Sequence, residues 1–120
     1  MAEKYYQGED ISITIVIYED QNMILKRDLT NVEVDMVLCN MAGGTKIIAS
    51  TDAKIVKREV AIERIDANTL RVVFNSFHTA RLSEGMAQVE MKVRDLIKGT
   101  TTISTNDSII IESSIIGKLT

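Results

Sequence analysis

The side chains that could do chemistry in this sequence are few, and His78 is the only histidine among them. A histidine can act as a general base or bind a metal ion, but a zinc site needs several further ligands. The neighbours of His78, from Ser76 to Thr79, include no cysteine or carboxylate. Ser76, Ser83 and His78 could join an aspartate in a catalytic triad, but neither serine lies in a nucleophile-elbow motif. We therefore expect His78 to be an ordinary loop residue and the chain to be non-enzymatic, with no catalytic, cofactor or metal site.

Cys39 is the only cysteine, so the chain cannot form an internal disulfide. A reactive thiol needs a cationic neighbour or a helix N-terminus. Cys39 instead follows Leu38 in a strand-like run. This position predicts a half-buried structural cysteine.

Two acidic pairs, Glu9-Asp10 and Glu19-Asp20, bracket an apolar run. Asp20 and Asn22 have the alternate spacing of a calcium-binding loop, which needs several converging oxygen atoms. The residues that follow, from Met23 to Leu25, supply no further acidic ligand. We interpret these carboxylates as solvated turn charges.

The composition is that of a folded domain, with 120 residues, 45% hydrophobic and 26% charged. There is no Pro and no Trp, and aromatic residues make up only 4%, so the core must be aliphatic. The net charge of −3 includes no basic cluster, which argues against nucleic-acid or membrane-surface partners. The N-terminus has no apolar signal segment. If Met1 is the native start, we expect synthesis in the cytoplasm without secretion.

Apolar residues alternate with polar ones almost throughout, which is the pattern of half-buried β-strands. Helical periodicity is limited to a turn at 76–82, with Ser76 as its cap and Gly85 as its stop. We expect polar turns at 20–22, 66–68 and Asn106-Asp107 and a hairpin at Gly43-Gly44. The predicted strands are 11–17, 32–39, 46–50, a weak strand at 54–57, 60–65, 70–74, 86–94, 102–104 and 108–112.

This spacing predicts one all-β domain over residues 1–120, an antiparallel β-sandwich of about seven to eight strands. We treat residues 1–8 as a loose N-terminal arm. Without proline to guard its edge strands, such a fold must use charge or a partner. The predicted core residues are Ile13, Ile15, Val34, Met36, Leu70, Val72, Val89 and Met91.

The six methionines fall into two groups. Met36 and Met91 lie on strand faces and are expected to fill the core. Met23, Met41 and Met86 lie near turns, where they either mark a contact surface or are scattered surface residues.

Three segments together resemble the immunoglobulin-like domain at the N-terminus of phage baseplate upper proteins, and related small modules of phage virions. In the first segment, Gly8-Glu9-Asp10 precedes a strand and Asp28-Leu29-Thr30 opens the next strand. The second segment is residues 67–72 (Ala-Asn-Thr-Leu-Arg-Val). The third is residues 78–85 (His-Thr-Ala-Arg-Leu-Ser-Glu-Gly), which precede a strand that ends in Asp95. The likeness spans about residues 8–95, although the glycine and proline common after Asp20, and most aromatics of the family, are missing. It implies an immunoglobulin-like sandwich that works as a structural virion subunit, with other protein subunits as partners. The alternative is a carbohydrate- or ligand-binding β-sandwich.

The C-terminal isoleucines suggest self-association. In a strand, the consecutive residues Ile109, Ile110 and Ile111 face both sides of the sheet, and Ile115 and Ile116 follow. One face can meet the domain's own core, and we expect a neighbouring copy to cover the other. A covering loop or a loose tail is the alternative.

Overall fold

The computed structural model describes residues 3–19, 22, 24–40 and 44–112. In this part of the chain nearly all regular structure is β, as the alternation predicts. The elements are β1 (Glu3–Tyr6), β2 (Ile11–Ile15), β3 (Val32–Asn40), β4 (Lys46–Ser50), β5 (Val60–Ala61), β6 (Glu63–Asp66), β7 (Thr69–Phe74), α1 (Ser76–Thr79), β8 (Gly85–Asp95) and β9 (Thr100–Glu112).

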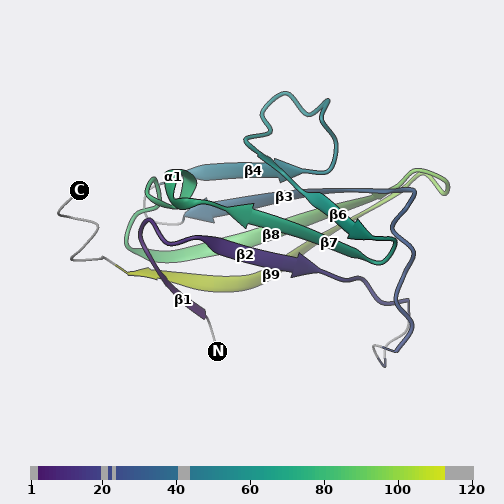
Figure 1. Cartoon of the computed structure of the whole chain (residues 1–120), viewed down its shortest axis with the longest axis horizontal. Coiled ribbons are helices and arrows are strands. Elements are labelled where there is room, and N and C mark those ends of the chain that lie inside the picture. Colours follow the sequence, from purple (N-terminus) through teal and green to yellow (C-terminus); the bar gives the residue numbers. More distant parts are fainter. Residues whose placement is uncertain (1–2, 20–21, 23, 41–43, 113–120) are drawn as a thin grey trace.

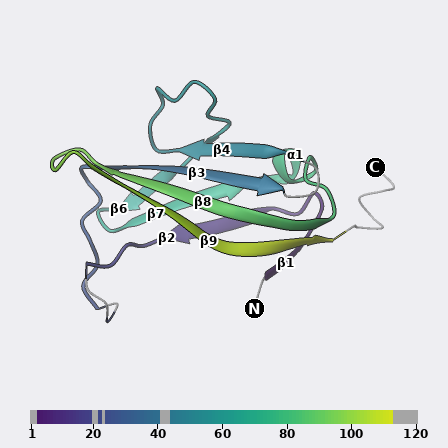
Figure 2. The same cartoon turned by 180° about the vertical axis from the view of Figure 1, so that it is seen from behind.

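The strands form two layers that pack like a sandwich (Figure 1). The large sheet has the order β1-β9-β8-β3-β4-β5, and the small sheet has the order β2-β7-β6. Seen from behind, the long strands β3, β8 and β9 form the near layer (Figure 2).

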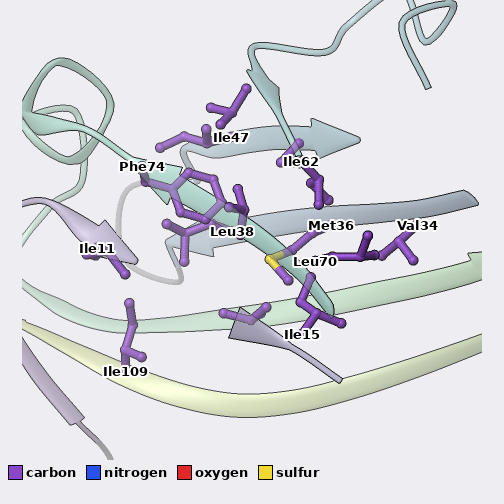
Figure 3. Packing of buried hydrophobic residues seen from close by; sticks show 14 of the residues in the cluster. Ile11, Ile15, Val34, Met36, Leu38, Ile47, Ile62, Leu70, Phe74 and Ile109 are labelled. Atoms are coloured by element: carbon purple, nitrogen blue, oxygen red, sulfur yellow. The ribbon is translucent and has the colours of Figure 1, made fainter. Parts of the chain in front are cut away.

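The core lies between the layers and follows directly from the alternation (Figure 3). Along β3 every second side chain from Val32 to Asn40 is buried, and those between are half-buried. The antiparallel register keeps the inward sets together, because directly opposite residues share a face: Leu38 pairs with Val89. Of the eight predicted core residues, six are buried, whereas Ile13 and Met91 are partly buried and pack against the cluster.

The first strand corrects two expectations. Residues 3–6 are not a loose arm, because β1 pairs with β9 from Glu3 opposite Ile109 to Tyr6 opposite Glu112. This pairing is parallel, as is that of β4 with β5, so the large sheet is not purely antiparallel. The backbone N–H of Gln7 extends the β1 pairing by donating to the carbonyl of Glu112 at 2.9 Å.

The segment 60–65 is two strands rather than one. β5 joins the large sheet, with Val60 opposite Ala49, and β6 joins the small sheet beside β7. Ile62, between them, is buried where the chain crosses between the layers. With β1 added and this segment divided, the described residues form nine strands, compared with the predicted seven to eight. The weak strand at 54–57 is wrong, because these residues form turns in the loop between β4 and β5.

The predicted turn at Asn106-Asp107 is also wrong, because β9 runs unbroken through it. The register with β8 passes from Ser108 opposite Gln88 to Asn106 opposite Val89, so Asp107 is an extra residue. An extra residue in one strand is a β-bulge, which turn-forming residues accommodate well. The hairpin turn lies at 96–99 instead, where Gly99 has φ 70°.

The turns at the other end agree more closely with the sequence. β3 and β4 pair as a hairpin, as Gly43-Gly44 predicts, and the N–H of Asn40 donates to the carbonyl of Thr45 at 2.8 Å. Gly43 itself lies outside the described residues. The helical turn α1 is shorter than expected. Its cap is Asn75 rather than Ser76, because the Asn75 side chain accepts from the N–H groups of Phe77 and His78.

Candidate interaction surfaces

One end of the sandwich is built on aspartates. β2, β4, β6 and β8 end there, and β3, β7 and β9 begin there. In four of the connections an aspartate Oδ1 accepts a hydrogen bond from the N–H two residues further on, which fixes a tight turn. The pairs are Asp28 with Thr30 (2.9 Å), Asp52 with Lys54 (2.9 Å), Asp66 with Asn68 (2.8 Å) and Asp95 with Ile97 (3.0 Å).

These hydrogen bonds lower the pKa of all four carboxyl groups, because a donor stabilises the charged form. For Asp28 the main cause is the hydroxyl of Thr30. For Asp52, Asp66 and Asp95 it is a backbone N–H, from Lys54, Asn68 and Lys98 respectively.

Arginines hold the same end together. A guanidinium nitrogen of Arg27 lies 2.5 Å from Oδ2 of Asp95, and Arg94 lies 3.1 Å from Asp35 and 3.6 Å from Asp52. The hydroxyl of Ser50 donates to Asp35 at 2.6 Å. These ion pairs join strands to loops, so the arginines and aspartates named here neutralise one another within the fold.

Arg64 links the two layers. From β6 in the small sheet, its guanidinium donates to the carbonyl of Leu29 at 2.6 Å and to that of Val32 at 2.7 Å, where β3 of the large sheet begins. It also lies 3.4 Å from a carboxylate oxygen of Glu33.

At the opposite end, Asn40 is a buried polar anchor that we did not single out from the sequence. Its side chain is fully buried. Oδ1 accepts from the N–H of Ser83 at 2.9 Å, and Nδ2 donates to the carbonyls of Ser83 at 3.2 Å and Met86 at 3.4 Å. The sequence pattern does indicate that Asn40 is buried, because Asn40 follows Val32, Val34, Met36 and Leu38 at every second position of β3, next to the predicted hairpin.

His78, Ser76 and Ser83, the residues considered for a catalytic triad, lie in and after α1. His78 is half-buried in α1, with its ring edge-on to Phe77 at a centroid distance of 5.6 Å. Ser76 is exposed at the start of that helix. Ser83 is half-buried, and its backbone is held by Asn40. The hydrogen bonds of this region therefore join Ser83 to Asn40 and cap α1 with Asn75.

The remaining candidates are dispersed. Cys39 is a half-buried free thiol, as predicted, at an outward position of β3. Glu9, Asp10, Glu19 and Asn22 are exposed, and Asp20 lies outside the described residues. Among the described residues, no group of three or more histidine, cysteine, aspartate or glutamate side chains could hold a metal ion.

The predicted interface isoleucines separate into two sets. Ile109 and Ile111 are buried in the domain's own core, so their side chains already have a cover within the chain. Alternation in β9 places Ile110 on the opposite face, where it is half-buried. Ile115 and Ile116 lie outside the described residues.

Large aliphatic side chains are nevertheless exposed at the loop tips. Val56 is 98% exposed in the β4–β5 loop, and Ile97 is 77% exposed in the β8–β9 turn. Ile24 and Leu25 are exposed in the loop before β3, and Leu96 lies beside Ile97. Contiguous exposed apolar groups mark contact surfaces, and these residues include two adjacent pairs, Ile24-Leu25 and Leu96-Ile97.

The methionines divide partly as expected. Met36 is buried, Met91 is partly buried and Met86 is exposed. Met23 and Met41 lie outside the described residues.

With this geometry in place, the chain was compared with known proteins. No protein-family model matches it, and no curated protein is significantly similar to it. Within the residues described, none of the helical structure is long and apolar enough to span a membrane.

Proposed function

We propose that this chain is a non-enzymatic structural subunit that acts by assembling with other proteins, including copies of itself. In this proposal the chain is an immunoglobulin-like β-sandwich that forms part of the baseplate, tail or head of a phage or prophage virion. Such a subunit would be made in the bacterial cytoplasm and would end in the virion.

The observation that carries this proposal is the set of aliphatic side chains at the loop tips. Val56 and Ile97 lose little contact with water in the folded chain, so the fold gains little from them. A partner surface would cover them and gain the hydrophobic free energy of their burial. The nearby aspartates Asp52 and Asp95 are engaged in turns and ion pairs, so the aliphatic groups and the exposed lysines Lys57 and Lys98 beside them form the contact chemistry of these loops.

The fold and the resemblance add support. Two packed sheets with strands that cross between layers are compatible with an immunoglobulin-like sandwich. The segments that resemble the virion modules include the Asp28 turn and the strand that ends at Asp95, both of which shape the loop end.

Light scattering on the full chain across the micromolar range tests the proposal. We expect a defined oligomer. A chain that remains monomeric throughout would contradict self-association. Specific and robust binding on a glycan array would favour a carbohydrate-binding module instead.

A further inference from the structure

β9 is much longer than the strand that covers its outer edge. It has 13 residues, and β8 pairs with it from Thr100 to Ile111. On its other side β1 pairs only with Ile109 to Glu112. Within the described part of the chain, β9 before Ile109 therefore has a strand neighbour on one side only. Backbone N–H and C=O groups on the free side of an edge strand are available to another strand.

This open edge, defined here as Thr100–Asn106, lacks the usual guards. Its seven residues include four threonines and one isoleucine, with no proline and no charge. β-Branched residues favour the extended conformation, whereas charges and prolines block edge pairing. Two other edges are protected, since β6 carries exposed charges from Glu63 to Asp66 and β5 has only two residues.

The side chains of the open edge are complementary to those of a second copy in antiparallel pairing. Ile103, its only large apolar residue, is central in the segment and 61% exposed. In an antiparallel pair with its two-fold axis at residue 103, Ile103 meets Ile103 of the second copy and residue 101 lies opposite residue 105. The nearest flanking charges in the sequence, Lys98 and Asp107, have opposite signs, so this register sets no like charges directly opposite each other.

The covered part of β9 limits the register. A pair centred on Ile103 uses residues 100–106 of both copies and ends before Ile109, where β1 begins to cover the edge. A centre shifted toward the C-terminus would bring the second copy against β1. The hairpin turn at 96–99 limits a shift the other way.

We propose that two copies of this chain pair antiparallel through their β9 edges, centred on Ile103, and join their large sheets into one continuous sheet. This inference rests on the proposed self-assembly and names its surface. The pairing is isologous, because the same edge serves both copies, and it closes as a two-fold dimer. It covers the exposed Ile103 side chain and gives the free backbone groups of the edge their partners.

Cysteine cross-linking tests the pairing and its register. In a Cys39→Ser background, Ile103→Cys should form a covalent dimer on mild oxidation, because residues at a two-fold axis in paired strands lie within disulfide reach. Thr101→Cys and Thr105→Cys should each fail to cross-link alone and should cross-link when the two variants are mixed. Equal cross-linking of all three single variants would indicate parallel pairing, and any other pattern, including none, would also overturn the proposal.

A charge on the edge gives an independent readout. Ile103→Lys should raise the dimer dissociation constant at least tenfold, since it sets two like charges against each other. The matched control is Ile65→Lys, at an exposed isoleucine of β6 in the small sheet, which should leave dimerisation unchanged. Circular dichroism checks that both variants fold. Oligomers that survive Ile103→Lys and show no β9 cross-link would overturn this inference and leave the proposed assembly function intact. A wild-type monomer would overturn both.

Discussion

The side chain of Asn40 makes two hydrogen bonds to the backbone of Ser83, 43 residues away. It accepts from the Ser83 N–H and donates to the Ser83 carbonyl. This pair joins the end of β3 to the segment that leads into β8. Because Asn40 is fully buried, water cannot replace either bond when the Asn40 amide is changed.

Asn40→Asp is expected to destabilise the fold by about 2–4 kcal/mol. A carboxylate can still accept from Ser83 but cannot donate to the carbonyls of Ser83 and Met86, and it is a buried charge. Urea denaturation measures the free energy of unfolding. Asn75→Asp is the matched control, because the exposed Asn75 acts only as an acceptor at the helix cap, and it should change stability by less than about 0.5 kcal/mol.

Arg64→Ala should lower the free energy of unfolding by about 2 kcal/mol, because it removes the charged donor to the carbonyls of Leu29 and Val32. Arg64→Lys should recover part of this loss, since an ammonium group can reach one carbonyl but lacks the two-pronged geometry of guanidinium. Arg71→Ala serves as the control. Its ion pair with Glu63 at 3.5 Å is exposed, so a loss of about 0–1 kcal/mol is expected. Equal losses for Arg64→Ala and Arg71→Ala would show that Arg64 does not link the layers.

Stability should fall in acid through the four turn aspartates. Their folded-state pKa values are lowered from 3.8, so the unfolded chain takes up protons first as the pH drops. The stabilisation is therefore fully present above the unfolded-state pKa and is lost as the pH falls through the folded-state values. Urea denaturation from neutral pH down to strong acid should show this decline.

Asparagine tests the origin of the acid sensitivity, because its side-chain oxygen also supports the turn but does not titrate. Replacing Asp28 and Asp66 by asparagine should flatten the acid part of the profile while largely keeping stability at neutral pH. An unchanged acid slope in this double variant would contradict the assignment to these turns.

Truncation at two positions should show which C-terminal residues contribute to the stability of the core. A chain ending at Ser108 loses the buried Ile109 and Ile111, each worth about 1.5–3 kcal/mol, and β1 loses its partner strand. We expect this variant to be unfolded or strongly destabilised. A chain ending at Glu112 keeps both isoleucines and should retain a cooperative thermal transition. Equal melting temperatures for the two truncations would show that Ile109 and Ile111 contribute little to the core.

The sequence by itself determined the β character, most strands and most of the core. Alternation along 32–40 and 86–94 specifies which face of each strand is apolar, because successive side chains in a strand point to opposite sides. Glycines and acidic residues marked several turns, since they favour tight-turn backbone conformations. The half-buried state of Cys39 also follows from its outward position beside inward Leu38.

Only the tertiary structure decided which strands are neighbours and what each polar residue does. Asn106-Asp107 has the composition of a turn, but continuous pairing with β8 makes it a bulge in a long strand. Ile109 and Ile111 were candidates for an interface until the packing of the two sheets buried them. The open edge of β9 likewise depends on how far β1 extends beside it. These features arise from contacts between residues far apart in the chain, which local periodicity does not encode.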